Sequence, residues 1–173
     1  RILKLLGEGK KVAYCSDAGT PGISDPGARA ARRARAAGHR VIPIPGPSAL
    51  AALASVAGFA ERGFLFDGFL SPKGARRRAR LAELLAREEA FLLYESPFRI
   101  CRLAADLAEL APERRVCLGR ELTKLHEQIV DCTAGELASR LAEGSDDPIP
   151  QKGEFAILVS GRAGKQGGEV EER

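Results

Sequence analysis

The stretch Lys11–Gly27, KVAYCSDAGTPGISDPG, decides the fold. Its first six residues predict a short strand, because Val12–Cys15 are contiguous and uncharged. A strand without alternation of polar and apolar residues is typical of a parallel α/β sheet that is covered on both faces. The loop 17–27 holds three glycines and two prolines, and residues 28–37 predict a helix that ends at Gly38. The stretch is therefore interpreted as a strand–loop–helix unit.

The residues on either side extend this pattern. Residues 1–9 read as the end of a helix, 40–44 as a second strand, 45–48 as a turn and 49–57 as an alanine-rich helix. Two strands make a poor sheet. We therefore expect that the first strands of this domain are missing from the chain or are supplied from elsewhere.

A second α/β unit follows. Patterns of apolar residues predict strands over residues 64–70, 91–94, 115–119, 128–132 and 154–160, and helices over 72–88, 98–110 and 134–142. The composition changes near Gly58–Gly63. The sequence thus predicts an α/β fold with an incomplete first domain over 1–62, a second domain over 63–161 and a disordered tail over 162–173.

Composition excludes several classes of protein. The chain has 45% hydrophobic and 29% charged residues and a net charge of +4, a balance that suits a globular protein and is compatible with a polyanionic partner. The apolar stretch Val41–Ala60 is interrupted by three prolines and two glycines, so we expect no membrane span. No leader is recognisable at the start, and we expect a cytoplasmic protein. The four cysteines have no paired spacing, which indicates reduced thiols and no metal site.

Two loops are candidates for ligand binding. The loop 17–27 follows a predicted parallel strand, and ligands of open α/β sheets bind at the carboxyl ends of strands. The turn 45–48 repeats this placement after the next strand. Neither a G-x-x-x-x-G-K-[ST] nor a G-x-G-x-x-G motif is present, which argues against nucleotide-phosphate and dinucleotide sites. The alternative is that both loops are only tight connections between a strand and a helix.

Six segments carry a resemblance to a known family. They are SDAGTPGISDPG, VIPIPGPSALAAL, GFLSPKGARR, LLYESPFR, GRELTKLHEQI and KGEFAILVSG. Together they resemble the ribosomal RNA small subunit methyltransferase I family of the tetrapyrrole-methylase superfamily, from about Arg1 to Gly161. The resemblance implies two α/β domains, the second with a mixed sheet, that flank a cleft for S-adenosylmethionine (SAM). It also implies 2′-O-ribose methylation of a cytidine in 16S rRNA of the small ribosomal subunit, by a homodimer.

The chain departs from the family pattern in two places. Members of the family begin with a strand and a T-P-I-G-N-L-G-D-like loop and continue with an E-D-T-R segment, and the chain contains neither. It therefore resembles a member that lacks its N-terminal segment, and we expect the 173 residues alone to be inactive. In addition, Phe98 stands where the family has histidine. His39 and His126 are each expected to be surface residues rather than bases.

The resemblance also implies which residues contact SAM. The loop 17–27 matches the segment that binds the methionine end of the cofactor, and two further sets match a second turn and an opposite wall. These residues are Gly19, Thr20, Pro21 and Ser24, then Ser48 and Ala49, and finally Tyr94, Glu95, Leu122, Thr123 and Ala156.

Two residues are candidates for the base that takes the proton of the ribose hydroxyl. Glu95 ends a predicted strand, and a desolvated Lys124 beside a sulfonium could have a lowered pKa. The alternatives are that Glu95 forms an ion pair with Arg99 at i+4, and that Lys124 is a solvated loop residue or a phosphate contact.

A cluster of cations follows Pro72 on a predicted helix, which suits contacts with RNA phosphates. Its members are Lys73, Arg76, Arg77, Arg78 and Arg80. An arginine-rich solvated face is the alternative. For the whole protein, the rivals to rRNA methylation are a tetrapyrrole C-methyltransferase of the same superfamily and a non-catalytic RNA binder in ribosome assembly.

Overall fold

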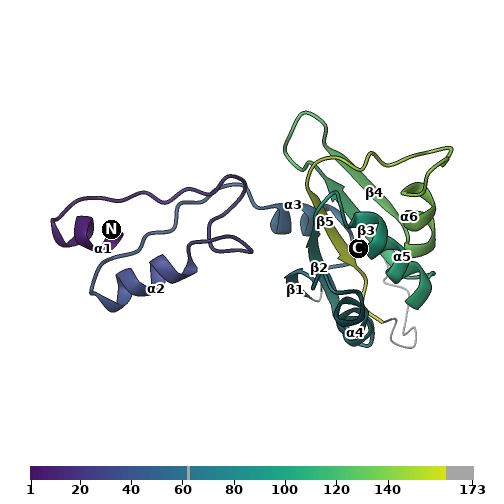
Figure 1. Cartoon of the computed structure of the whole chain (residues 1–173), viewed down its shortest axis with the longest axis horizontal. Helices are drawn as coiled ribbons and strands as arrows, with labels where there is room; N and C mark the ends of the chain where they lie inside the picture. The colour runs from purple at the N-terminus through teal and green to yellow at the C-terminus, as the bar shows by residue number, and fades with distance from the viewer. Residues whose placement is uncertain (62, 163–173) are drawn as a thin grey trace, which may run out of the picture. The chain divides into compact units, whose positions relative to one another are not determined.

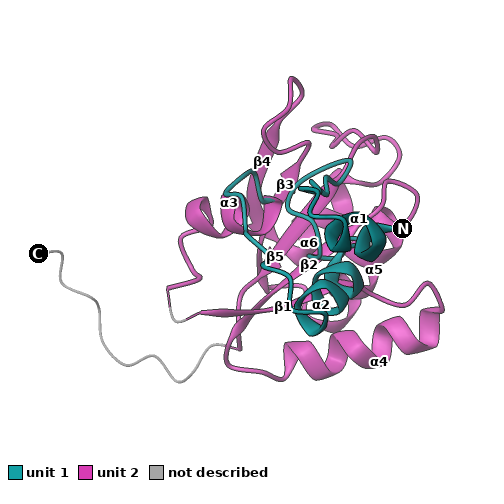
Figure 2. Cartoon of the chain, turned by 90° about the vertical axis from the view of Figure 1, so that its left-hand side faces the viewer, with its two compact units in different colours: residues 1–48 teal, residues 49–173 magenta. Residues whose placement is uncertain are grey.

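The computed structural model describes residues 1–61 and 63–162. The chain divides into two compact units, Arg1–Ser48 and Ala49–Arg173 (Figure 2). The first unit contains the helices α1 (Ile2–Gly7) and α2 (Ala28–Ala36). The remaining helices and all strands of the described residues belong to the second unit (Figure 1).

The first unit has long extended segments instead of the predicted strands. Residues 11–16 and 40–44 pair with no strand within the part of the chain that the structure describes, so these two predictions are wrong. A parallel ladder needs a neighbouring strand for its hydrogen bonds. Without one, apolar side chains such as Tyr14, Ile42 and Ile44 remain exposed. The helix predicted over 28–37 is confirmed as α2, whose Ala34 is buried.

The second unit is built on one mixed sheet. Its strands are β1 (Phe64–Phe69), β2 (Ala90–Glu95), β3 (Arg115–Arg120), β4 (Gln128–Thr133) and β5 (Phe155–Val159). Within the described residues their order is β1-β2-β5-β3-β4. Strands β1 and β2 are parallel, while β5 lies antiparallel between β2 and β3, and β4 pairs antiparallel with β3. All five strands predicted in this unit are confirmed.

Four helices cover the two faces of this sheet. They are α3 (Ala49–Val56), α4 (Gly74–Leu85), α5 (Ile100–Leu110) and α6 (Ala134–Arg140). One hydrophobic cluster joins α4, α5 and α6 to strand residues such as Phe91 and Leu93. A second cluster joins Leu53 of α3 to Leu92 and Leu158. The alternation of Phe91, Leu92 and Leu93 between the clusters follows from the two-residue period of a strand.

Helix α3 packs against β3 and β5 and belongs to the second unit. The boundary between the two compact units therefore lies after Ser48, upstream of the change in composition at Gly58–Gly63. The physical reason is that Leu53 of α3 and Ala57, which follows the helix, cover a sheet face that would otherwise be apolar and exposed. The assignment of domains to 1–62 and 63–161 stays a prediction, and the predicted tail falls almost entirely on residues 163–173, outside the described residues. The predicted α/β class with a mixed second sheet is confirmed.

Candidate functional site

The loop 17–27 of the first unit has a backbone shape that depends on its glycines. Gly19, Gly22 and Gly27 have φ values of 69°, 85° and 143°, a region that side-chain-bearing residues rarely occupy. Ser24 also has a positive φ of 52°. A Cβ atom added at Gly27 would lie 3.3 Å from the nitrogen of Gly22, so the loop is also closely packed there. The shape is therefore specific, which a mere connection does not require.

A hydrogen bond joins this loop to the second candidate loop. The Thr20 hydroxyl donates to the carbonyl oxygen of Pro47 over 3.0 Å. The residue after Pro47 is Ser48, which is half-buried. Thr20 and Ser48, predicted from separate motifs, are thus brought into one part of the first unit. Gly19 and Pro21 are exposed beside this bond.

Asp25 supplies an acceptor that has no donor. Its Oδ2 atom is buried and has no hydrogen-bond partner within the described residues. Buried polar atoms are nearly always hydrogen-bonded, so an oxygen of this kind indicates where a missing donor would sit. A ligand with an ammonium or hydroxyl group would satisfy it.

In the second unit, four predicted cofactor residues gather around the start of α3. Ala49, Tyr94 and Leu122 are half-buried against the hydrophobic cluster that contains Ala156. Tyr94 and Ala156 are direct partners across β2 and β5. The Tyr94 hydroxyl accepts a hydrogen bond of 3.0 Å from the backbone N–H of Leu50. Partial burial raises the pKa of Tyr94, so the hydroxyl stays protonated near neutral pH.

Aromatic packing holds Tyr94 from the β1 side. The ring of Phe66 meets Tyr94 edge-on with the ring centroids 4.9 Å apart, and that of Phe69 does so at 5.9 Å. Leu122 is held differently, because a Cβ atom at Gly119 would lie 2.8 Å from its Cδ1 atom. Only glycine at position 119 leaves room for the observed place of Leu122. The result is a small apolar surface with one polar hydroxyl.

The loop that follows β3 carries backbone strain. Glu121 and Thr123 have φ values of 50° and 66°, and for the β-branched Thr123 such a value is unusual. The N–H of Thr123 donates to the carboxylate of Glu127 over 2.5 Å, which helps to hold this conformation. Strained residues of this kind concentrate at binding and catalytic sites.

Lys124 does not have the lowered pKa that a base would need. Its ammonium group contacts Glu154 at 2.8 Å and Glu121 at 3.0 Å. These two carboxylates raise the pKa of Lys124 above its ordinary value, and they do so mainly through their hydrogen bonds. The expectation of a lowered pKa is therefore wrong in this structure, and the residue remains a cation.

Glu95 is buried on the opposite side of β2 from Tyr94. Its side chain has no exposed surface and lies 2.6 Å from the guanidinium of Arg99, the ion pair that the sequence offered as an alternative. The same oxygen accepts a 2.7 Å hydrogen bond from the N–H of Ser96. The other oxygen is buried without a partner within the described residues. These contacts favour a structural role over that of a base that must reach a substrate.

The predicted cluster of cations on α4 is largely neutralised. Arg77 is buried and lies 2.6 Å from Asp106, and Arg80 lies 2.6 Å from Asp67. Arg78 contacts Asp106 and Glu109. Lys73 and Arg76 are exposed and form no ion pair with a described residue. Of the five predicted RNA contacts, these two alone keep a charge that no described carboxylate balances.

The buried pair of Arg77 and Asp106 gives a stability prediction. Both side chains are only 10% exposed, so Asp106→Ala would leave a buried guanidinium without its carboxylate. We expect the variant to lose about 3 kcal/mol of unfolding free energy, measured by urea denaturation. The matched control is Glu109→Ala, which removes an exposed partner of Arg78 and is expected to change stability very little. Equal losses for the two variants would contradict this interpretation.

Sequence reasoning missed three contributors to these surfaces. Leu50 contributes only its backbone N–H, which no side-chain pattern reveals. Gly119 contributes space, and its position at the end of a predicted strand was the available signal. Asp25 was visible in the motif, but its unpartnered oxygen depends on how the loop folds.

Comparisons with known proteins bear on both units. The family model for Tetrapyrrole (Corrin/Porphyrin) Methylases matches residues 1–138. A "Ribosomal RNA small subunit methyltransferase I" from Xylella fastidiosa is 43% identical over 173 residues, covering 99% of this chain and 62% of that protein. The protein of the same name from Borrelia garinii subsp. bavariensis is 40% identical over 159 residues, covering 92% of this chain and 70% of its own length. The chain thus spans about three fifths of the Xylella relative.

Solved structures support the same fold. The methyltransferase CobJ matches with a TM-score of 0.64 and 22% identity, over 96% of this chain and 71% of its own. The uroporphyrin-III C-methyltransferase from Thermus thermophilus, solved with S-adenosyl homocysteine, matches with a TM-score of 0.50 and 21% identity. The match covers 81% of this chain and 62% of that protein. At such identities the likeness concerns the fold alone.

Proposed function

Because this chain belongs to the tetrapyrrole methylase family and, within it, to the ribosomal RNA small subunit methyltransferase I group, we propose that it is part of a SAM-dependent rRNA methyltransferase. The reaction that we assign is 2′-O-ribose methylation of a cytidine in 16S rRNA. The observation that carries the proposal is the 43% identity over 99% of the chain, because it includes both candidate loops and the strained loop after β3.

The residues present suit SAM. SAM carries an ammonium group, a carboxylate and a sulfonium, so its site needs acceptors, backbone donors and apolar surface. The unpartnered oxygen of Asp25 is an acceptor, and the positive φ of Gly19 leaves backbone without a side chain. Tyr94 and Leu122 offer apolar surface in the second unit. We assign the methionine end to Gly19, Thr20, Pro21 and Ser24, with further contacts from Ser48, Ala49, Tyr94, Leu122, Thr123 and Ala156.

When bound, SAM would supply an already activated methyl group. The task of the chain is then mainly to align donor and acceptor, since in-line displacement requires a precise approach. The Thr20–Pro47 hydrogen bond holds two loops in a fixed relation for this purpose. Lys124 is a cation in this structure, and Glu95 has no exposed side-chain surface, so we give neither the task of taking the hydroxyl proton.

The test uses the gene product that carries this chain, with small ribosomal subunits from a strain that lacks the modification. Incubation with SAM carrying a labelled methyl group should place the label on a cytidine 2′-oxygen of 16S rRNA, as read by mass spectrometry of nuclease fragments. Unmodified rRNA after incubation with correctly folded protein would overturn the proposal. Methylation of a porphyrinoid instead would support a tetrapyrrole methyltransferase, and RNA binding without affinity for SAM would support a non-catalytic binder.

Two further properties belong to the proposal. We propose a homodimer, which sedimentation of the gene product would test. We also propose a cytoplasmic location, where ribosomal subunits are found. In the part of the chain that the structure describes, no helix is both long and apolar enough to span a membrane.

A further inference from the structure

The positive charge of the chain is concentrated in the first unit. Residues 1–48 contain nine Lys and Arg against three Asp and Glu, a net charge of +6. Residues 49–173 contain 18 against 20, a net charge of −2. The overall charge of +4 therefore hides one basic and one slightly acidic unit.

Helix α2 carries the centre of this charge. Arg29, Arg32 and Arg33 stand at i, i+3 and i+4 and so share one face of the helix. The opposite side contains the buried Ala34. All three arginines are exposed, as are the nearby Arg35 and Arg40. We call Arg29, Arg32 and Arg33 the α2 basic face.

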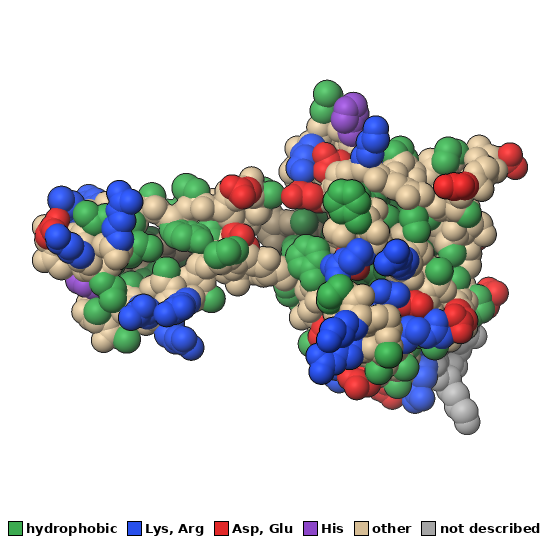
Figure 3. Space-filling view, viewed as in Figure 1, with side chains coloured by type: hydrophobic (Ala, Val, Ile, Leu, Met, Phe, Trp, Pro, Cys, Tyr) green, Lys and Arg blue, Asp and Glu red, His purple; other side chains and the backbone are tan. Residues whose placement is uncertain are grey.

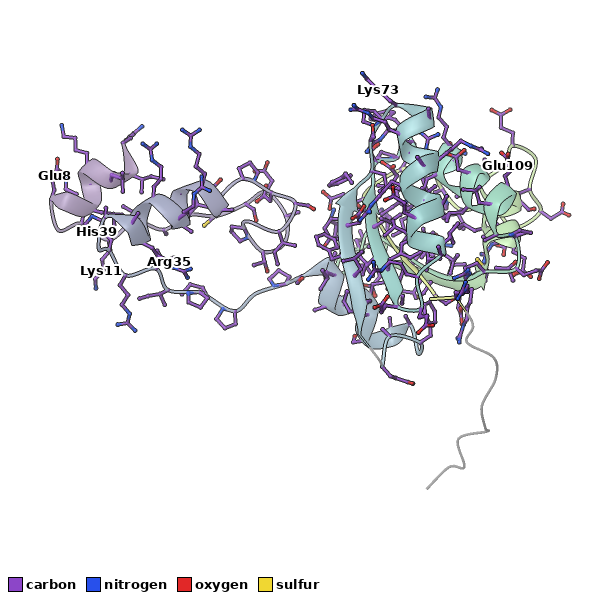
Figure 4. All side chains as sticks on the ribbon, turned by 90° about the horizontal axis from the view of Figure 1, so that it is seen from below. Glu8, Lys11, Arg35, His39, Lys73 and Glu109 are labelled. Carbon is purple, nitrogen blue, oxygen red and sulfur yellow. The ribbon has the colours of Figure 1, made fainter. Side chains whose placement is uncertain are left out.

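No carboxylate of the described residues forms an ion pair with the α2 basic face. In the first unit the structure shows one ion pair, between Lys10 and Glu8. Figure 3 shows Lys and Arg side chains gathered over the unit that contains α1 and α2. Figure 4 labels Arg35 on α2, with Lys11 and His39 in the same unit.

Arginine is used differently in the second unit. Arg77 and Arg80 of α4 contact Asp106 and Asp67, and Arg115 of β3 contacts Asp131 at 2.7 Å. In the first unit three carboxylates stand against nine cations, so most of its positive charge cannot be neutralised within the unit and is available to an anionic partner. Like charges at i and i+4 also destabilise the helix that carries them, which makes a purely structural role less favourable.

We propose that the α2 basic face is the surface that holds the phosphate backbone of the RNA substrate. The proposal rests on the rRNA methyltransferase function given above and adds the place where the RNA docks. An exposed row of guanidinium groups fits a row of phosphates, to which arginine can donate two parallel hydrogen bonds. Such contacts give affinity and position without reading the base sequence. The α2 basic face therefore replaces α4 as the main electrostatic contact, since α4 is mostly neutralised.

The test measures binding of protein-free small-subunit rRNA to the gene product over a range of salt concentrations. Arg29→Gln/Arg33→Gln removes two charges from one face and keeps residues with good helix propensity. We expect the affinity at 0.1 M salt to fall by about 25- to 60-fold. The slope of log affinity against log salt should become shallower by about 1.4 to 1.8, the value for two lost phosphate contacts. The loss should be the same for unrelated RNA sequences.

The matched control is Arg102→Gln/Lys152→Gln, which removes two exposed cations of the second unit that form no ion pair with a described residue. It should leave the salt slope within experimental error of the parent protein.

An equal loss of RNA affinity in the control, or an unchanged salt slope in the α2 variant, would overturn the proposal. SAM binding, measured by calorimetry, should be the same in all three proteins. If the parent protein binds SAM and methylates rRNA while the α2 variant binds RNA normally, this inference fails and the proposed function stands. If the parent protein neither binds RNA nor methylates small subunits, both fail.

Discussion

Gly19→Val is expected to reduce the affinity of the gene product for SAM by about 100-fold, which corresponds to about 3 kcal/mol of loop strain. Gly19 has a φ of 69°, and a β-branched residue in this region is strongly disfavoured. The loop would have to change shape, which would disturb the neighbouring hydrogen bond from Thr20 to Pro47. Isothermal titration calorimetry with SAM measures the effect directly.

The control for this variant is Gly38→Val. Gly38 has a similar φ of 79°, and an added Cβ atom would meet no other atom within 4 Å. The local strain is therefore comparable, but Gly38 lies after α2 and outside the two candidate loops. We expect this control to lose stability and to keep its SAM affinity. If both variants lose SAM binding equally, the loop 17–27 has no special role in the cofactor site.

Glu95→Ala is expected to destabilise the second unit by about 3 kcal/mol, because it leaves the largely buried guanidinium of Arg99 without its carboxylate. For a chain of this size the melting temperature should fall by roughly 6 to 12 °C. The N–H of Ser96 would also lose its acceptor. Differential scanning calorimetry provides the measurement.

A second variant separates stability from catalysis. Glu95→Leu/Arg99→Met replaces the whole pair with apolar side chains and should recover much of the lost stability. If Glu95 is structural, this double variant should methylate small subunits at nearly the parent rate. A stable double variant that is slower by 100-fold or more would instead support the role of a general base.

Local patterns were sufficient to place the elements of the second unit. Phe91–Tyr94 is an apolar run that predicts a strand, and it forms the centre of β2, with Phe91, Leu92 and Leu93 fully buried. The helices predicted over 72–88, 98–110 and 134–142 appear as α4, α5 and α6 with ends a few residues shorter. The same reasoning failed at residues 11–16 and 40–44. A strand exists only with a partner to pair with, and local apolar character does not provide one.

Prediction of the candidate site from sequence meets the same limit, because local motifs do not show which distant residues come into contact. The motifs selected Thr20, which contacts Pro47 next to Ser48, and Tyr94, which pairs with Ala156, while their assignment as SAM contacts stays a prediction. They could not separate Tyr94 from Glu95, which are adjacent in sequence and face opposite sides of β2. They also could not distinguish the neutralised Arg77 from the exposed Arg76, because the deciding partner, Asp106, lies 29 residues away.

By itself the sequence determined the family, the α/β class, the positions of most helices and strands, and the glycine positions that the loop 17–27 requires. These properties depend on residue type and local spacing, which the sequence states directly. The tertiary structure decided the strand order, the side of the sheet that each residue faces, and which charges find a partner. These depend on contacts between residues far apart in the chain. For that reason the ion pairs of α4, which only the structure shows, led us to propose the α2 basic face as the RNA contact.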